Sequence, residues 1–490
     1  MLGKQSNHSD QAQLVTVAAL VPPKHVLRRL HAILELSFVR EKVASLYSRF
    51  GRPSIDPELV VRMWILQHFY DFSERQLCDE LTMHAGFRWF CGLSFADRVP
   101  DQSTLVKLRN EKWAKSGLWE EILTETVRLC EAAGIAQPGQ GQRLGIDGTQ
   151  IHANAAIVSL EAIPPELTVV EGGEGGGGAE AKSAASPPPS AAAPVAATPP
   201  PALRLEAGGQ PHGPHRSGDP EWHGEHFSNA THRSTTDPEA RLYRKSGGQE
   251  AKLRYLGHYL ADVRCGVIYG AMATQATGTA EREAALLLLD ELAELPAELA
   301  GDLGYRDGGF LAAVLSRGVQ PLVPLQDEPL EAEPTWVRRA SSPAQQQQRE
   351  AKLAAARARN ATRLAVQGRR GVAAQRQRTR LEHLFGEGKE HHGLGEAEGR
   401  GLIRVDQQVK LTASVQNLKR WARSRPRRRA AQLPANFRPL MARLRAPIGP
   451  PSRRSRRQDA TRLICRHRAT PESHQPDREL PRLFERGENH

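Results

Sequence analysis

The chain has 490 residues, enough for roughly two to four domains of ordinary size. Hydrophobic residues make up 39% of it and charged residues 25%, which excludes a chain that is disordered throughout. No apolar run approaches the roughly 20 residues of a membrane-spanning helix, and the five cysteines are scattered without a C-x-x-C pair. The composition therefore argues against a membrane partner and a disulfide scaffold, and it predicts a cytoplasmic protein.

The positive charge is concentrated in two stretches of the sequence. Lys and Arg total 67 against 55 Asp and Glu, a formal net charge of +12. Nine basic residues and no acid lie between Lys352 and Arg380, and seven more lie between Lys419 and Arg429, again without an acid. Such blocks usually contact a polyanion, because each neutralised phosphate releases counterions, although a solvated tail can have the same composition. The pattern favours a nucleic-acid partner.

Residues 21–135 have the pattern of helices and follow a segment, residues 1–20, that we expect to be flexible. Asp56-Pro57 has the form of a helix start, with Asp as N-cap and Pro at the first helical position. Ser73-Glu74-Arg75-Gln76 has the form of a capping box at the start of the next helix. The sequence therefore predicts an all-α N-terminal domain.

A later helix of this region carries Lys107 and Arg109 on its polar side. Helices joined by a short glycine-containing turn are compatible with a DNA-binding helix-turn-helix, although most such pairs are only packed together. We predict that this domain binds DNA through those two cations.

Two segments have a biased composition. Residues 157–227 are rich in Gly, Pro and Ala and cannot bury enough apolar surface to offset their ordering entropy, which predicts a disordered low-complexity insertion. Residues 422–490 are rich in Arg and are predicted to form a basic, disordered C-terminal tail.

The remaining residues, 140–156 and 228–421, alternate strands with helices. A mixed sheet flanked by helices in this order matches the ribonuclease-H-like plan, so the predicted fold class is α/β with an all-α domain in front. The expected elements are strands at 143–151, 255–263 and 266–272, a helix at 281–295, a strand ending at 302, a helix at 309–317, a strand at 320–325 and a basic helical stretch to about 390.

Three acidic residues lie where a metal-dependent site would place them, at two strands and on the following helix: Asp147, Asp302 and Glu382. Each also has a structural interpretation, as a turn residue, a helix cap and a partner of nearby arginines, respectively. On a helix, Arg378 and Lys389 would share the face of Glu382 to within about 40°. On such a face the carboxylate could bind a metal ion while the two cations contact phosphates. A ladder of surface ion pairs would have the same spacing.

With these segments in place, the sequence resembles the DDE transposases of bacterial insertion sequences, specifically the InsH-like group. The resemblance covers most of residues 20–421 outside the insertion. Two positions depart from the family pattern, because Gln375 stands where the family's Y-R-E-K signature has Tyr, and Leu303 replaces a frequent Lys or Arg. The matching segments are the helical residues 21–99 with Gly51-Arg52-Pro53, Gly145-Ile146-Asp147-Gly148-Thr149, Thr236-Asp237-Pro238-Glu239-Ala240-Arg241, Asp302-Leu303-Gly304-Tyr305, Arg378 with Glu382 and Lys389, and Asn417-Leu418-Lys419-Arg420.

The resemblance implies a transposase that binds the terminal inverted repeats of an insertion sequence and catalyses metal-dependent DNA cleavage and strand transfer. Asp147, Asp302 and Glu382 would be its catalytic residues and the ligands of two Mg²⁺ or Mn²⁺ ions. Its partner would be double-stranded DNA, at the transposon ends and at the target, bound by at least a homodimer in the nucleoid. The residues expected to contact DNA are Arg378, Lys389, Lys419, Arg420, Lys107 and Arg109.

Two alternatives stay open at this point. One is a catalytically inactive remnant that only binds DNA, and the other is a metal-dependent nuclease without joining activity.

Overall fold

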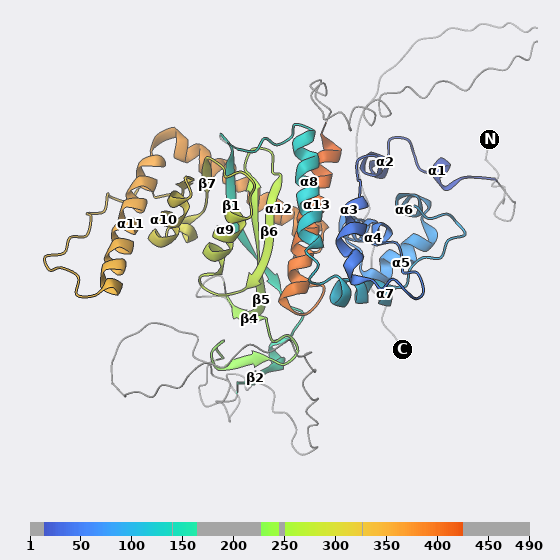
Figure 1. The fold of residues 1–490 in the computed structure, drawn as a ribbon, viewed down its shortest axis with the longest axis horizontal. Helices are drawn as coiled ribbons and strands as arrows, with labels where there is room; N and C mark the ends of the chain where they lie inside the picture. Colours follow the sequence, from blue (N-terminus) through green and yellow to red (C-terminus); the bar gives the residue numbers. More distant parts are fainter. Residues whose placement is uncertain (1–13, 140, 164–226, 245–249, 326, 425–490) are drawn as a thin grey trace, which may run out of the picture. The chain divides into compact units, whose positions relative to one another are not determined.

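The computed structural model describes residues 14–139, 141–163, 227–244, 250–325 and 327–424 (Figure 1). Residues 1–13, most of the expected insertion and the residues after 424 lie outside the described residues, so the disorder expected there stays a prediction. Among the helices of the described ranges, none is long and apolar enough to cross a membrane.

Two boundaries of the expected unstructured segments are wrong. Helix α1 (Val17–Leu20) lies within the N-terminal segment that was expected to be flexible. The expected insertion begins later than residue 157, because β2 (Leu160–Ala162) pairs antiparallel with β3 (His232–Ser234). Leu160 is 6% exposed and packs into the hydrophobic core of the sheet, and this burial favours the ordered two-stranded ribbon.

The predicted helical N-terminal region is confirmed, and the two predicted helix starts are both present. The Asp56 carboxylate accepts the Glu58 N–H, and Pro57 occupies the first position of the helix. The Ser73 side chain and the Gln76 side chain complete a reciprocal capping box. The further helices are α2 (Val26–His31), α3 (Ser37–Val43), α4 (Pro57–Tyr70), α5 (Glu74–Met83), α6 (Ala85–Phe90), α7 (Gln102–Lys107) and α8 (Leu118–Ala132), with a π-helical turn at Leu108–Lys112.

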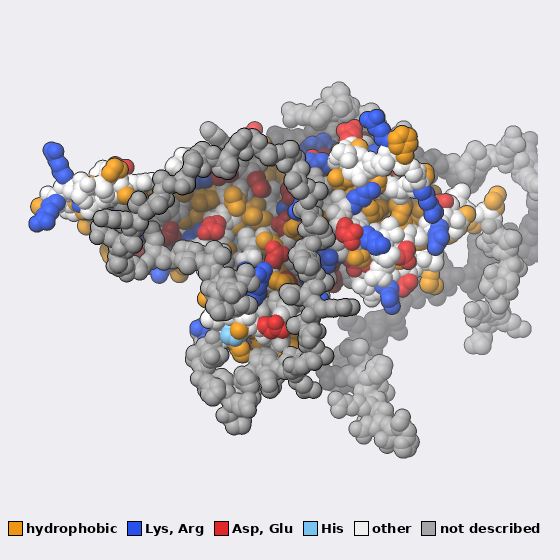
Figure 2. Space-filling model, turned by 60° about the horizontal axis from the view of Figure 1, so that its bottom comes forward, with side chains coloured by type: hydrophobic (Ala, Val, Ile, Leu, Met, Phe, Trp, Pro, Cys, Tyr) orange, Lys and Arg blue, Asp and Glu red, His pale blue; other side chains and the backbone are white. Residues whose placement is uncertain are grey.

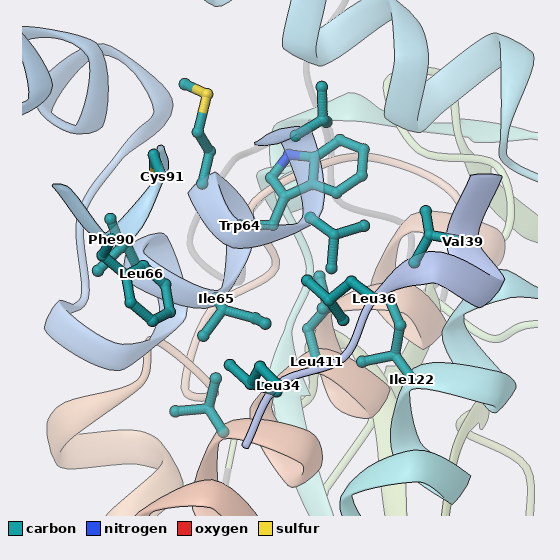
Figure 3. Close-up of a cluster of buried hydrophobic side chains, with 14 of the residues drawn as sticks. Leu34, Leu36, Val39, Trp64, Ile65, Leu66, Phe90, Cys91, Ile122 and Leu411 are labelled. Carbon is teal, nitrogen blue, oxygen red and sulfur yellow. The ribbon is translucent and has the colours of Figure 1, made fainter. Parts of the chain in front are cut away.

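Trp64 of α4 is at the centre of the core of these helices (Figure 3). Its ring is fully buried and meets the rings of Trp113 and Trp119 at centroid distances of 5.4 and 5.1 Å. The same core includes Leu411, which comes from a helix at the far end of the described chain. The N-terminal helices therefore do not close their core by themselves.

Six strands form a mixed sheet with the ribonuclease-H-like topology, and β2 and β3 form a separate two-stranded sheet. The order in the six-stranded sheet is β4-β5-β1-β7-β8, with β6 also paired to β5. Strand β1 runs antiparallel to β5 and parallel to β7, and β7 runs parallel to β8. The predicted order of strands and helices is confirmed. The strands are β1 (Arg143–His152), β4 (Arg241–Tyr243), β5 (Lys252–Asp262), β6 (Ile268–Gln275), β7 (Glu298–Ala300) and β8 (Gln320–Leu322).

Helices cover both faces of this sheet. The expected basic helical stretch is two helices, because the chain turns at Gly368, whose φ of +67° suits only a residue without a Cβ. The expected helix at 281–295 ends earlier, at Asp290. The helices are α9 (Ala280–Asp290), α10 (Gly308–Ser316), α11 (Pro343–Ala365), α12 (Gly368–His391) and α13 (Leu402–Arg423).

Helix α13 connects the N-terminal helices with the sheet. In Figure 1 it lies beside α8, and it also contacts α4 and β6. Leu411 and Val415 pack into the core around Trp64, while Val409 and Ala413 pack into the core under β5. The two regions that the sequence separates as domains are therefore joined through one buried helix.

Candidate active site

Asp147 lies near the middle of β1, on the face of the sheet that α12 covers. Side chains alternate between the two faces of a strand, so Gly145 and Asp147 share a face. A Cβ at Gly145 would stand 2.6 Å from Leu381 of α12, so the glycine lets this helix pack directly against β1. The Asp147 carboxylate, 16% exposed, accepts the Gly148 N–H at 2.9 Å.

Asp302 is level with Asp147 at the end of the neighbouring strand. The parallel register pairs Gly145 with Ala300, and both aspartates stand two residues beyond that pair. The Asp302 carboxylate also accepts the Gly304 N–H at 2.8 Å, at the start of a 3-10 turn. The interpretation of Asp302 as a cap is thus correct, and it does not remove the residue from the neighbourhood of Asp147.

Glu382 is joined to Asp147 through Arg378, one turn earlier on α12. The Arg378 guanidinium donates to Asp147 Oδ2 at 3.3 Å and to Glu382 Oε1 at 2.8 Å. Arg378 is 16% exposed, whereas Glu382 is 57% exposed. Two nitrogens of the arginine therefore bind one largely buried carboxylate, Asp147, and one exposed carboxylate, Glu382.

The electrostatics of this group are dominated by negative charge. Burial raises the pKa of the Asp147 carboxyl to about 6, and the adjacent Asp302 and Glu281 carboxylates add to the rise, while Arg378 opposes it. Burial also raises the pKa of the Tyr305 hydroxyl, with Glu281, Asp147 and Asp302 as further causes. The Arg378 guanidinium pairs with two of these carboxylates, Asp147 and Glu382.

Two family models match the chain over these regions. Residues 15–111 match the family described as "Transposase domain (DUF772)", and residues 229–418 match the "Transposase DDE domain". The chain belongs to the DDE transposases of insertion sequences. The InsH-like group stays a prediction, since neither match specifies it.

One curated relative shows a more limited similarity to this DDE transposase-family chain. An uncharacterized protein of Rhizobium meliloti, ORF8 in the nfe locus, is 27% identical over 133 residues, 27% of this chain. The chain covers 63% of that protein's length. No solved structure matches.

Glu281, at the start of α9, is a fourth carboxylate of the site that sequence reasoning missed. A Cβ on Gly148 would lie 3.0 Å from Glu281 Oε1, and a Cβ on Gly304 would lie 3.7 Å from Glu281 Oε2. The side chain therefore lies between the residue after Asp147 and the loop after Asp302. In the sequence Glu281 is only the first acid of an amphipathic helix, so no motif marks it.

Carboxylate oxygens are the ligands preferred by hard divalent cations, the kind of cofactor that DDE domains normally use. All four groups of the site offer carboxylate oxygens, and Asp302 and Glu281 add to the rise that burial causes in the pKa of Asp147. Within the described residues, no three His, Cys, Asp or Glu side chains are close enough together to hold a metal ion. Arg378 stands between Asp147 and Glu382 and supplies the positive charge there.

The position of Gln375 explains the departure from the family signature. Its amide donates to the carbonyl oxygens of Gly301 and Leu322, at 3.3 and 3.2 Å. The side chain thereby fastens α12 to the ends of β7 and β8, next to Asp302. At this position of the DDE domain the side chain supports the sheet.

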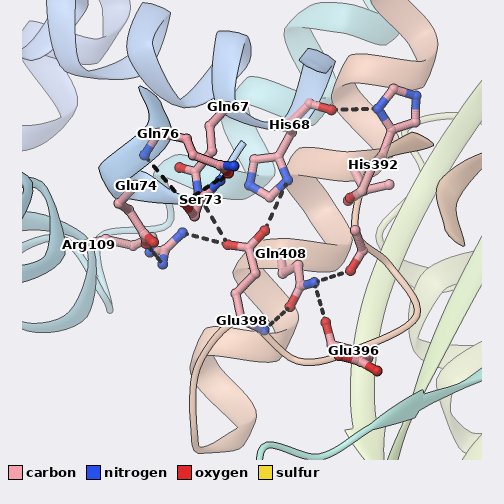
Figure 4. Close-up of polar contacts among 12 residues, drawn as sticks. Gln67, His68, Ser73, Glu74, Gln76, Arg109, His392, Glu396, Glu398 and Gln408 are labelled. Atoms are coloured by element: carbon pink, nitrogen blue, oxygen red, sulfur yellow. Dashed lines mark hydrogen bonds and ion pairs between the residues drawn. The ribbon is translucent and has the colours of Figure 1, made fainter. Parts of the chain in front are cut away.

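The prediction that Arg109 lies on an exposed polar face is wrong. Its side chain is 8% exposed and forms ion pairs with Glu74 of α5 and with Glu398, which precedes α13, the latter at 3.1 Å (Figure 4). Glu398 lies 289 residues away in the sequence, so the sequence gave no sign of this pairing. Arg109 therefore joins the N-terminal helices to the DDE domain, and its predicted DNA contact stays untested.

Lys419 and Arg420 are also turned toward the protein. Both pair with Glu387 of α12, at 2.7 and 3.3 Å, and their side chains are 13% and 17% exposed. Glu387 supplies one negative charge to these two cations, and their DNA contact stays a prediction. Lys107 and Lys389 are exposed.

The basic block between Lys352 and Arg380 is partly neutralised in space. Acids from the loop before α11 pair with Arg357, Arg359 and Arg363, and Glu298 of β7 pairs with Arg370. In the view of Figure 2, Lys and Arg side chains over the N-terminal helices are likewise mixed with Asp and Glu. A run without acids in the sequence is thus not a free cationic surface.

Proposed function

We propose that the chain is a transposase that binds the ends of an insertion sequence, cleaves DNA there and transfers the strand to target DNA. Asp147, Asp302 and Glu382 are its catalytic carboxylates. The observation that carries this proposal is the register of β1 and β7, which sets Asp147 level with Asp302, while Arg378 links Asp147 to Glu382.

The chemistry requires an activated oxygen nucleophile and relief of charge on the attacked phosphate. Bound at these carboxylates, two Mg²⁺ or Mn²⁺ ions would supply Lewis-acid activation and charge neutralisation. Asp147 is the fixed ligand, because it lies in β1, which pairs with β5 on one side and with β7 on the other. Glu382 is the adjustable one, since it is more than half exposed and is held only by an i to i+4 ion pair.

Arg378 is the residue that orients these ligands. Its guanidinium keeps the carboxylates of Asp147 and Glu382 apart and partly offsets their repulsion. Lys389, exposed on the same helix, is the DNA-phosphate contact of this face. The synaptic complex with paired transposon ends is a homodimer or a larger assembly.

The test uses the full chain and a short duplex taken from the DNA that flanks the coding region. In Mg²⁺ or Mn²⁺ we expect the wild type to give cleaved and joined products, and Asp147→Asn to give neither while it still binds the duplex. Asp290→Asn is the matched control, because this exposed aspartate only pairs with Arg317 on the surface.

The products separate the alternatives. Cleaved but unjoined duplex would identify a nuclease, and binding without cleavage by the wild type would identify an inactive DNA-binding remnant. Normal cleavage by Asp147→Asn would contradict the assignment of the carboxylates.

A further inference from the structure

A basic pocket lies where the N-terminal helices meet the start of α13. Its volume is about 370 Å³. One wall is formed by the π-helical turn and the residues after it, including Lys112 and Lys115. The opposite wall is formed by Arg400 and Arg404, at the start of α13. Segments almost 300 residues apart in the sequence thus supply cations to one cavity.

Four cations line this pocket, namely Lys112, Lys115, Arg400 and Arg404. Among the described residues, none of them lies within ion-pair distance of a carboxylate, although most arginines of α11 and α12 do. The Lys112 ammonium rests on the ring of Tyr47, 3.3 Å from its centroid, which leaves its charge uncompensated. The Arg400 Nε donates to the backbone oxygen of Asn154 at 3.3 Å, which orients the side chain without neutralising it.

The acids near the pocket are outnumbered, and one of them is already engaged. Glu111 and Glu239 are the two carboxylates of the lining. Glu239 accepts the Leu402 N–H at 2.8 Å and so caps the first turn of α13. Two positive charges remain in excess, in a cavity open to solvent.

The walls of the pocket are fixed to each other by buried contacts. Gln407 of α13 donates to the carbonyl oxygen of Arg109 at 3.3 Å, and the Arg109–Glu398 ion pair lies next to this bond. Asp237, fully buried, accepts the Gly401 N–H and the Tyr255 hydroxyl at 3.2 and 2.6 Å. The segment Thr236-Asp237-Pro238-Glu239-Ala240-Arg241 therefore holds the start of α13 in place, which gives this motif a role apart from the carboxylate site.

We propose that this pocket binds phosphate groups of a double-stranded DNA backbone, with Arg400 and Arg404 on one wall and Lys112 and Lys115 on the other. The chemistry follows from four unpaired cations in a preformed, water-accessible cavity, which matches a phosphodiester better than an apolar or cationic ligand. The assignment rests on the proposed function, because it takes DNA as the substrate. The pocket would add a DNA contact that is independent of base sequence. Residues of the N-terminal helices and of the DDE domain would both contribute to this contact.

The experiment measures the salt dependence of duplex binding by the full-length double variant Arg400→Gln/Arg404→Gln. Each phosphate contact contributes about 0.9 to the slope of log K against log salt, so the variant is expected to lose about 1.8 of that slope. The double variant Arg317→Gln/Arg357→Gln is the control, because it removes the same charge from two arginines that already have carboxylate partners. Its slope should equal that of the wild type.

A second variant, Lys115→Gln, changes an exposed residue of the other wall and is expected to lose about 0.9 of the slope. An unchanged slope in both variants would overturn the pocket assignment and leave the proposed function intact. A wild type that binds no duplex would overturn both.

A measurement with inorganic phosphate distinguishes a pocket that binds a free phosphate ion from one that binds the phosphates of DNA. If phosphate raises the melting temperature of the wild type but not of Arg400→Gln/Arg404→Gln, while the slopes for duplex DNA are equal, the pocket takes a free anion and the DNA assignment is wrong. Loss of slope for the duplex, with or without an effect of phosphate, supports the assignment.

Discussion

Arg109 and Arg378 each stand between two carboxylates, and the difference between the two clusters separates a structural ion pair from a catalytic candidate. Around Arg109 every partner is largely covered, with Glu74 16% and Glu398 24% exposed. Around Arg378 the inner Asp147 is 16% exposed, but the outer Glu382 is 57% exposed. Two more carboxylates, Asp302 and Glu281, raise the pKa of Asp147, whereas Glu74 and Glu398 are the ion-pair partners of Arg109 among the described residues.

The comparison shows that the arginine alone does not reveal the role of such a cluster. A guanidinium enclosed with its partners between helices fixes one region to another, and its removal leaves buried charge. A guanidinium that faces excess negative charge at an open edge marks a place where further cations can bind. Substitution of Arg109 should therefore change the stability of the fold, and substitution of Arg378 should change DNA cleavage.

The largest expected effect on stability is that of Arg109→Ala. It removes the one ion-pair partner that Glu74 has among the described residues and one partner of Glu398, and loss of one member of a buried pair costs about 3–5 kcal/mol. Chemical denaturation of the full chain measures this change.

Arg378→Ala is the matched control for that measurement. Its partner Glu382 is well solvated and Asp147 can take up a proton, so the free energy of unfolding should fall by only about 1–2 kcal/mol. Equal losses in the two variants would remove the distinction between the clusters.

A smaller effect is expected from pH, through two imidazoles beside the Arg109 cluster (Figure 4). Burial lowers the pKa of His68 to about 3 and that of His392 to about 4, with the nearby cations Arg109 and Lys419 as further causes. The unfolded chain protonates both near pH 6.5. Between those values the unfolded state binds more protons, so each imidazole lowers stability as pH falls below 6.5, with a slope that approaches about 1.4 kcal/mol per pH unit.

Denaturation midpoints at pH 6.5 and 5.5 test this dependence. His68→Asn should flatten this dependence in part, because His392 and His258, whose pKa burial also lowers to about 4, keep contributing. His383→Gln, at an exposed residue, is the control. The raised pKa of Asp147 acts in the opposite direction over this interval, so the test is the difference between the variant and the wild type. Equal pH dependence in His68→Asn and the wild type would show that His68 is not held neutral.

Local chemistry made much of the fold predictable from the sequence. The caps at Asp56 and Ser73 depend on neighbours within three residues, and both are present. The strand with Asp147 and the short strand before Asp302 also follow from local apolar patterns, and the parallel pairing of β1 with β7 then sets the two aspartates level.

What the sequence could not reveal depends on partners that are distant in the chain. Arg109 looks like a surface cation until Glu398 is placed beside it, and the arginines of α11 look unpaired until the preceding loop folds back. Glu281 belongs to no motif, and its position matters only because Gly148 and Gly304 leave space for it. Such pairings are decided by tertiary packing, which a linear charge pattern does not contain.

Mn²⁺ binding to the full chain without DNA, measured by titration calorimetry, tests most directly whether the three carboxylates converge. We expect the wild type to bind Mn²⁺, and Asp147→Asn and Glu382→Gln each to lower the affinity by more than about tenfold, as loss of a ligand should. Asp290→Asn should bind like the wild type. Equal Mn²⁺ affinity in all four proteins would contradict a shared metal site at Asp147, Asp302 and Glu382.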